Sequence, residues 1–310
     1  MNRISVISCI ALFAVTSMAQ AQLVADGTFD NLPVGTAPNC SQYAGAWGWP
    51  AYYVSAGTCE PESAAFQTVP TGSFEAGAVG NSLQLHVVNA PTPVGYQLPN
   101  ILTRTIQEEA EQLILVKFSI WVPQPGVKGG SVYVGGDHGG GGFGFATDRG
   151  PQMSWLANGT WIRANPGGQG PVVLLQNYPT GAWLNVKLVI DLVNDTYDVW
   201  YSTLPSGPFT LIAVDAPFRS GSLDHLDRFT VANFDFPQIE TALMFVDNVS
   251  VVVTHVSDIN TDGHVDVNDL LAVISAWGAC PAPPTACPAD VNHNGTVDVN
   301  DLLSVITHWG

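Results

Sequence analysis

The chain has 310 residues and is strongly acidic, with 26 Asp and Glu against nine Lys and Arg and a formal net charge of −17 at pH 7. A protein so poor in basic residues is a weak candidate for binding nucleic acid or an anionic membrane. The length allows one substantial hydrophobic core and a smaller second module.

The N-terminus has the pattern of an export signal. Arg3 precedes a short apolar stretch from Ile4 to Val15, and small residues follow at Ser17-Met-Ala19 and Ala19-Gln-Ala21. This predicts a signal peptide spanning residues 1–21 and a secreted protein, extracellular or associated with the cell surface. No later run approaches the roughly 20 apolar residues that cross a bilayer, so we expect no transmembrane segment.

Four cysteines remain once Cys9 leaves with the signal peptide. Export favours disulfides. Of the three possible pairings we prefer Cys40 with Cys59 and Cys280 with Cys287, because each pair then lies within one module. Zinc binding is the alternative, but no two cysteines have the two-residue spacing that is common in zinc sites.

Residues 22–254 predict a single β-sandwich domain of two antiparallel sheets. Leu184, Val186, Leu188 and Ile190 alternate with polar residues, and Asn194-Asp195 predicts a tight turn into a second strand, Thr196–Tyr201. Many short apolar runs between Gly and Pro residues are typical of such folds. Further strands are expected at Leu83–Val88, Leu113–Val122, Ser131–Val134, Pro171–Gln176, Phe209–Val214, Arg228–Ala232 and Ser250–Thr254.

Several segments of this domain resemble secreted jelly rolls of the concanavalin-A and laminin-G type. The resemblance is carried by Gly27–Gly35, by Trp183–Asp191, by Tyr197-Asp198-Val199 and by Phe245–Val249. It implies the fold more firmly than any activity, because jelly rolls include lectins, glycanases, lyases and spacers.

Motifs for catalysis are missing from the domain. The Glu-x-Asp-x-x-Glu pattern of glycanases with this fold does not occur, nor does a Gly-x-Ser-x-Gly elbow. Aromatic side chains remain as candidates for stacking on sugar rings, namely Trp155, Trp161, Trp47 and Trp49. The alternative is that they fill the core, which we expect more strongly for Trp121 and Trp200 on their strands.

The segment 255–310 is predicted to form a separate domain, because it contains one calcium-loop pattern twice, 32 positions apart. Oxygen-bearing side chains stand at loop positions 1, 3, 5, 9 and 12, and glycine at position 6 permits the sharp turn. Position 7 contributes its backbone carbonyl. The predicted ligands of two Ca²⁺ ions are Asp258, Asn260, Asp262, His264, Asp266 and Asp269 in loop one, and Asp290, Asn292, Asn294, Thr296, Asp298 and Asp301 in loop two.

All seven Asp residues between Val256 and Gly310 occupy these ligand positions, and the segment has no Glu, Lys or Arg. A merely solvated acidic surface would scatter its carboxylates. Because the crowded carboxylates repel one another, we expect the segment to be largely unfolded without calcium. Asn294 replaces the Asp of loop one, which gives loop two one charge fewer.

A short amphipathic helix is predicted after each loop, and no helix before it. One apolar stripe contains Leu270, Leu271, Val273, Ile274 and Trp277, and its repeat contains Leu302, Leu303, Val305, Ile306 and Trp309. Gly278 and Gly310 are suitable C-terminal stops.

This loop–helix pair resembles a type I dockerin over Asp258 to Gly310. The resemblance implies docking onto a cohesin-like module of a scaffold or cell surface, in a setting of polysaccharide use. In that family, loop positions 10 and 11 help to choose the partner. Here they are Val267 and Asn268 in one repeat and Val299 and Asn300 in the other.

The sequence favours a secreted docking protein whose sandwich binds a polysaccharide without cleaving it. Two rival hypotheses remain open. One is a polysaccharide-degrading enzyme, a hydrolase or lyase, whose site assembles from distant residues. The other is a structural protein of the cell surface.

Overall fold

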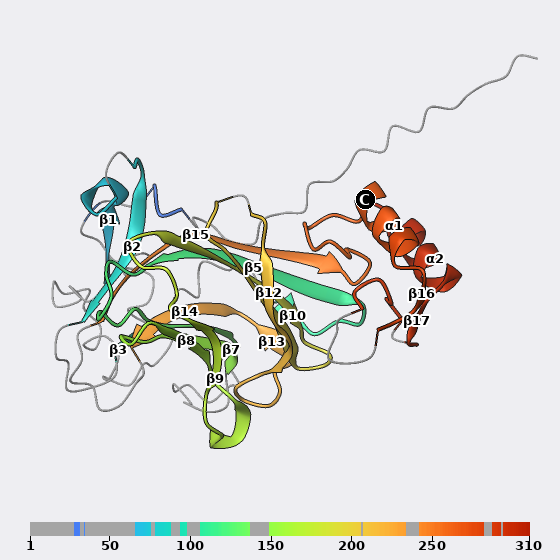
Figure 1. The fold of residues 1–310 in the computed structure, drawn as a ribbon, viewed down its shortest axis with the longest axis horizontal. Helices are drawn as coiled ribbons and strands as arrows, with labels where there is room; N and C mark the ends of the chain where they lie inside the picture. Colours follow the sequence, from blue (N-terminus) through green and yellow to red (C-terminus); the bar gives the residue numbers. More distant parts are fainter. Residues whose placement is uncertain are drawn as a thin grey trace, which may run out of the picture.

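The computed structural model describes residues 28–31, 34, 66–75, 78–87, 94–97, 106–136, 149–205, 207–233, 242–281, 287–292 and 294–310. A two-sheet sandwich lies beside a small helical module that contains the C-terminus (Figure 1). The fold class predicted from the sequence is confirmed. No helix in the described part of the chain is long and apolar enough to cross a membrane. The proposed signal peptide lies outside the described residues.

The first sheet has seven antiparallel strands with β5 near its centre. β15 and β10, which are far from β5 in the chain, pair with it on either side. Val116 of β5 lies opposite Val251 of β15 and opposite Leu188 of β10. In spatial order the strands are β1 (Phe66–Pro70), β2 (Asn81–Val87), β15 (Ala242–His255), β5 (Gln112–Trp121), β10 (Trp183–Asp191), β11 (Thr196–Ser202) and β12 (Thr210–Pro217).

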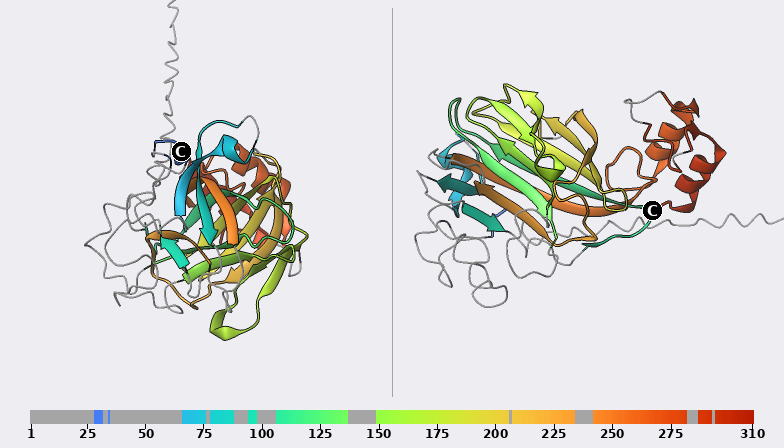
Figure 2. Two further views of the ribbon diagram at one scale, coloured as in Figure 1. Left: turned by 90° about the vertical axis from the view of Figure 1, so that its left-hand side faces the viewer. Right: turned by 90° about the horizontal axis from the view of Figure 1, so that it is seen from below.

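The second sheet has six strands and packs face to face against the first (Figure 2). Its order is β3 (Val94–Gln97), β14 (Arg228–Asn233), β6 (Gly130–Gly135), β7 (Arg149–Trp155), β8 (Thr160–Arg163) and β9 (Val172–Gln176). A small pair, β4 (Ile106–Gln107) with β13 (His225–Leu226), and two 3-10 turns, η3 (Thr71–Ser73) and η5 (Pro166–Gly168), complete the sandwich.

The predicted hairpin is present between β10 and β11. Asp191 pairs with Thr196, and the Asn194 backbone N–H donates to Asp191 Oδ1 (3.0 Å). Asp195 has a φ of 54°, a left-handed conformation that Asp tolerates in tight turns. The sequence therefore located this turn correctly.

The tryptophans are distributed differently from the expectation. Trp155 and Trp161 are fully buried and stacked on each other, with ring centroids 5.3 Å apart. They are core residues with no surface for a sugar, so their expected role in carbohydrate binding is wrong for this structure. Trp121 and Trp200, expected in the core, lie half-buried on the outer face of the seven-stranded sheet. Trp47 and Trp49 lie outside the described residues.

The helical module contains α1 (Val267–Ser275), β16 (Gly278–Ala279), β17 (Thr296–Val297) and α2 (Val299–Thr307). It follows the sandwich almost without a linker. β15 ends at His255 and loop one begins at Asp258, whose Oδ2 accepts a hydrogen bond from Thr254 Oγ1 (3.0 Å). The last strand of the sandwich thus leads directly into the first loop.

The outer face of the seven-stranded sheet also contacts the helical module. Lys187 on β10 is buried, and its Nζ donates to Thr261 Oγ1 in loop one (2.6 Å). The same Nζ lies 4.6 Å from the centroid of the Trp200 ring. Burial lowers the pKa of Lys187 to about 8, with a further lowering from Lys117, while Asp258 opposes the shift. A cation on the sandwich therefore faces the acidic loop.

Truncation of the buried tryptophan pair tests the core. Trp161→Ala should lower the free energy of unfolding of the sandwich by about 3–5 kcal/mol, because it leaves a cavity beside Trp155. Denaturant unfolding followed by tryptophan fluorescence measures this. Val173→Ala, at an exposed position of β9, is the control and should change the free energy by less than about 1 kcal/mol. Equal effects of the two substitutions would contradict the assignment.

Candidate functional site

Loop one folds its predicted ligands around one point. Asp258 accepts hydrogen bonds from the backbone N–H groups of Asp262 (3.1 Å) and Gly263 (2.9 Å). Asn260 Oδ1 also accepts from Asp262 N–H (2.8 Å), and Asp262 Oδ1 accepts from His264 N–H (3.0 Å). Gly263 has a φ of 108°, which an L-residue would adopt only with strain. The turn at position 6 therefore brings positions 1, 3 and 5 together as predicted.

The end of loop one is also the start of α1. Asp266 is the N-cap and accepts from Asn268 N–H (2.7 Å), while Asp269 Oδ2 accepts from Asp266 N–H (2.8 Å) in a capping box. Asp269 Oδ1 reaches back to Asn260 N–H (3.0 Å). The carboxylate at position 12 thus connects the two ends of the loop while its negative charge lies at a helix N-terminus.

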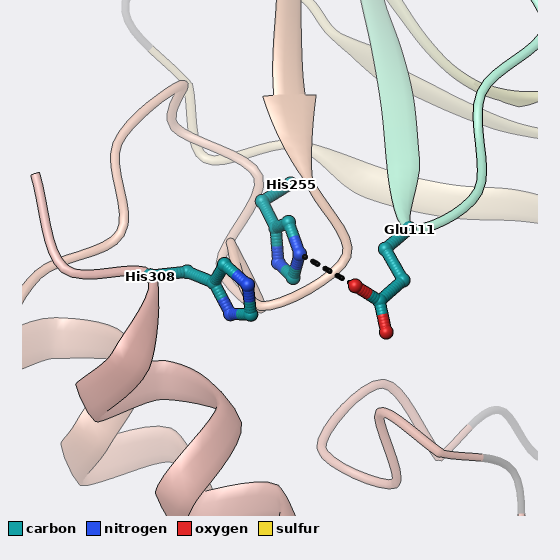
Figure 3. A group of neighbouring side chains, drawn as sticks. All are labelled: Glu111, His255 and His308. Carbon is teal, nitrogen blue, oxygen red and sulfur yellow. Dashed lines mark ion pairs between the residues drawn. The ribbon is translucent and has the colours of Figure 1, made fainter.

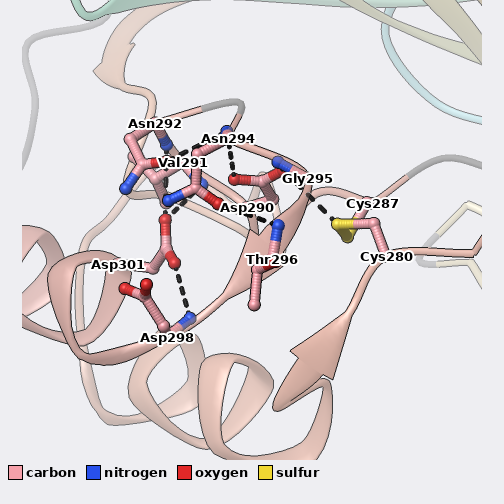
Figure 4. Close-up of a disulfide and its surroundings, with 10 residues drawn as sticks. All are labelled: Cys280, Cys287, Asp290, Val291, Asn292, Asn294, Gly295, Thr296, Asp298 and Asp301. Carbon is pink, nitrogen blue, oxygen red and sulfur yellow. Dashed lines mark hydrogen bonds between the residues drawn. A yellow bond between two sulfur atoms is a disulfide. The ribbon is translucent and has the colours of Figure 1, made fainter.

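Loop two repeats this geometry (Figure 4). Asp290 accepts from Asn294 N–H (3.0 Å) and Gly295 N–H (2.8 Å). Asp298 caps α2, and Asp301 Oδ2 accepts from Asp298 N–H (2.8 Å). The remaining positions correspond too, because Asn292 Oδ1 accepts from Asn294 N–H and Asn294 Oδ1 accepts from Thr296 N–H.

The two repeats are connected in a pseudo-symmetric way. Gly278, after α1, pairs with Val297 of loop two, and the Gly310 N–H, after α2, donates to the Val265 carbonyl of loop one (3.1 Å). Each helix therefore ends by binding the opposite loop. The small core between them contains Val265, Val273, Ala289, Val297 and Val305.

Burial makes it energetically costly to keep the carboxylates of the loops ionised when no cation is bound. Asp258 and Asp269 are almost fully buried. Burial raises the pKa of Asp258 to about 6, and the neighbouring Asp269 and Asp262 raise it further while hydrogen bonds oppose the shift. Burial also raises the pKa of Asp269. A hard divalent cation with oxygen ligands fits this donor set.

The connector between the repeats is closed by the predicted disulfide Cys280–Cys287. Cys280 N–H donates to the Gly295 carbonyl (3.0 Å), and Asp290 N–H donates to the Cys287 carbonyl (3.0 Å). Both half-cystines thereby attach to loop two, and Figure 4 shows the disulfide beside that loop. Cys40 and Cys59, the other predicted pair, lie outside the described residues.

Each helix has two apolar faces where the sequence predicted one stripe. Leu270 and Val273 of α1 pack inward, whereas three other apolar side chains of α1 are exposed in a row that Trp277, two residues past the end of the helix, continues. The row on α1 and its repeat on α2 have exposed fractions between 42% and 54%. The residues are Val267, Leu271, Ile274 and Trp277, and then Val299, Leu303, Ile306 and Trp309.

These rows include Val267 and Val299, which the sequence marked as partner-binding positions. Asn268 and Asn300 beside them are exposed as well. The sequence analysis missed the other six members, because it described the apolar residues of each helix as one stripe and did not separate an inward face from an exposed one. The signal was available, since five apolar positions in nine residues exceed what one side of a short helix can bury.

On the sandwich, an aromatic cluster lies on the outer face of the seven-stranded sheet. The half-buried Trp121 and Trp183 meet edge to face, with ring centroids 5.7 Å apart. Phe74 stacks on Phe245 (3.8 Å) and contacts both tryptophans. Trp183 Nε1 donates to Glu75 Oε2 (2.7 Å). The cluster combines partly exposed aromatic rings with a carboxylate, and the sequence analysis did not name it.

Residues 256–309 match the family model of the dockerin type I domain. The chain therefore has a dockerin domain at its C-terminal side, and such domains bind calcium. No curated protein matches the chain in sequence.

Several solved structures are similar in fold. The catalytic domain of a GH131 β-glucanase from Podospora anserina is 14% identical over 74% of this chain and 95% of that one, with a TM-score of 0.46. A UEA-II lectin in complex with galactose is 13% identical over 61% and 89%, with a TM-score of 0.39. Peanut lectin is 11% identical over 61% and 89%, with a TM-score of 0.40.

Asp258→Ala tests loop one. The substitution removes the acceptor of two backbone N–H groups and a predicted calcium ligand, so it should weaken calcium binding at that loop by at least about tenfold. Calorimetry on the metal-stripped protein measures the affinity. Asp191→Ala, in the β10–β11 turn, removes a carboxylate elsewhere and should leave it unchanged. An Asp258→Ala protein with unaltered calcium affinity would contradict the ligand assignment.

The raised pKa of Asp258 predicts opposite effects of pH on two quantities. Calcium binds the carboxylate, so its affinity should fall as the pH drops from 7.5 through about 6. The metal-free fold should become more stable over the same range and down to about pH 4, because the folded state then holds a proton that the unfolded state releases. Calcium titrations at pH 7.5 and 5, and the helical circular dichroism of the metal-free protein at the same two pH values, measure both. Parallel changes would contradict the prediction.

Proposed function

We propose that this protein is secreted, binds two calcium ions and docks through its C-terminal module onto a cohesin-like partner on a scaffold or cell surface. The observation that carries this proposal is the pair of exposed apolar rows, each on a helix that begins at a calcium loop. The sandwich is then the part of the protein that docking holds in place.

The rows suit a protein partner. Leu, Ile and Trp side chains that are about half exposed gain free energy when a partner covers them, at about 25 cal/mol for each Å² of apolar surface removed from water. Trp277 and Trp309 are suited to be anchors, because tryptophan is enriched among energetically dominant interface residues. Asn268 and Asn300 supply amide groups beside the rows.

The repeated arrangement implies two equivalent docking faces. Val267 corresponds to Val299, Leu271 to Leu303 and Trp277 to Trp309. The backbone contacts that Gly278 and Gly310 make with the opposite loops relate the two helices by pseudo-symmetry. A partner that recognises one face can recognise the other after the module is turned. Either face alone therefore suffices for docking.

Calcium would act by holding the rows in place. The proposed ligands are the six positions of each loop, from Asp258 to Asp269 and from Asp290 to Asp301. Asp269 and Asp301 belong both to a loop and to the capping box of its helix. Neutralising these carboxylates stabilises the loop, the helix start and hence the exposed row together.

Variants of the two rows test docking. We expect Leu271→Asp with Trp277→Asp to retain binding to a cohesin module because the second face remains, and the matching pair Leu303→Asp with Trp309→Asp to do the same. The four changes combined should lower affinity by at least about a hundredfold. Surface plasmon resonance against a panel of cohesin modules, with calcium or chelator, measures this. Full binding by the fourfold variant to a module that captures the unmodified protein would exclude these faces.

For the sandwich, we propose that the cluster of Trp121 and Trp183 binds a polysaccharide without cleaving it. Sugar rings present C–H faces that stack on aromatic rings, and their hydroxyls need polar partners such as Glu75. The glycanase carboxylate pattern is missing from the sequence, which favours binding over hydrolysis. An enzyme remains the second candidate, and a structural role the third.

Retention on insoluble polysaccharides, with assay of released sugars, separates these functions. Trp183→Ala should lower retention at least about fivefold without any product appearing. Trp277→Ala, which removes an exposed tryptophan of the docking module, is the matched control and should be retained like the unmodified protein. Released product would support the enzyme, and no retention on any polysaccharide would support the structural role.

A further inference from the structure

Three potential metal ligands meet where the sandwich contacts the helical module, apart from both calcium loops. Glu111 lies in the turn before β5, His255 is the last residue of β15, and His308 follows α2 as its C-cap (Figure 3). One ligand atom from each of the three lies within 4.8 Å of the other two. They come from positions almost 200 residues apart in the chain, so only the fold brings them together.

The distances are close to those of a single transition-metal site. A tetrahedral zinc ion with bonds of about 2.0–2.1 Å holds its ligand atoms about 3.3 Å from one another. His255 Nε2 and Glu111 Oε2 are already 3.5 Å apart. The rings of His255 and His308 lie face to face with centroids 3.6 Å apart. Because the stacked rings direct their in-plane lone pairs side by side, the exposed His308 ring has to turn before its nitrogen and that of His255 point at one ion.

His308 already has the tautomer that binds a metal through Nε2. Its Nδ1 lies 2.9 Å from the Ser304 carbonyl oxygen. A carbonyl only accepts hydrogen bonds, so Nδ1 carries the proton and the lone pair of the neutral ring is on Nε2. Metal-bound histidines are commonly fixed in this way by a backbone carbonyl at the other nitrogen.

His255 needs only an exchange of tautomer. Its Nδ1 accepts from the Ser257 N–H (3.0 Å), which places the proton on Nε2 toward Glu111. Ser257 Oγ is also 3.0 Å from Nδ1 and can accept a proton donated from that nitrogen. Moving the proton to Nδ1 costs the Ser257 N–H bond and frees the Nε2 lone pair, with no net release of a proton. Nε2 is enclosed, and its one neighbouring acceptor in the described structure is the Glu111 carboxylate at 3.5 Å.

The electrostatic setting favours a cation. The site lies at the C-terminal end of α2, where the helix dipole is negative. Glu111 adds a carboxylate and is held by its own carbonyl, which accepts from Val256 N–H (2.9 Å). Its φ of 62° is unusual for a residue other than glycine, and such conformations are concentrated at functional sites.

We propose that Glu111, His255 and His308 form a binding site for a borderline divalent transition-metal ion of the zinc type. Two imidazoles and one carboxylate are the ligand set that such ions prefer, whereas calcium selects oxygen ligands. The ion links the sandwich, through Glu111 and His255, to the last helix of the docking module. It therefore fixes the orientation in which the sandwich is presented to whatever the module docks onto.

Zinc titration of the full chain, with both calcium loops saturated, tests the site. We expect one Zn²⁺ ion per chain, and Co²⁺ in its place should give the intense visible absorption of four-coordinate cobalt. Glu111→Gln and His308→Gln should each weaken zinc binding by at least about tenfold, because even outer partners of a metal site contribute that much. Zinc should also raise the melting temperature of the unmodified protein and not that of the two variants.

His86→Gln is the matched control, because His86 is an exposed histidine on β2, outside the cluster. It should bind zinc like the unmodified protein. Thermal unfolding without zinc shows that each variant is folded. The proposal is overturned if no zinc binds under calcium saturation, or if His86→Gln weakens binding as much as His308→Gln. It is equally overturned if His308→Gln binds zinc with unchanged affinity.

Discussion

Repulsion between buried carboxylates limits the stability of the helical module, and we propose that calcium relieves this repulsion. Asp258 and Asp269 in loop one, and Asp290 and Asp301 in loop two, are buried with their oxygens directed at backbone N–H groups of the same loop. Hydrogen bonds offset part of the cost of burying these groups. On our proposal a bound cation offsets the rest of this cost, so the helices and their exposed rows are only as stable as the loops beneath them.

The contact between the sandwich and the helical module links the stability of loop one to the sandwich. β15 ends three residues before Asp258, Thr254 donates a hydrogen bond to that carboxylate, and Lys187 of β10 donates one to Thr261. The docking module is therefore a continuation of the sheet, and a change in loop one reaches residues of β10 and β15. The cluster of Glu111, His255 and His308 adds a second connection between the sandwich and the end of α2.

Much of this was predictable from the sequence, where local rules decide the structure. Period-two alternation located β10 and β11, and ligand spacing located both loops, because these patterns depend on residues close together in the chain.

The burial of Trp155 and Trp161 was not predictable in the same way. Alternation tells which residues share a face but not which face the other sheet covers, and so the tryptophans of the core and of the outer face were exchanged. The exposed apolar rows were missed for a related reason, since a docking face and a core face have the same composition. His255 and His308 belong to no local sequence motif, and only the tertiary fold places them beside Glu111.

Calorimetric titration of calcium into the metal-stripped, full-length protein tests the central claim most directly. Two binding events per chain are predicted, together with a rise in helical circular dichroism as the capping boxes of α1 and α2 form. A trace without heat of binding, or helices that are fully formed before calcium is added and indifferent to it, would contradict the account.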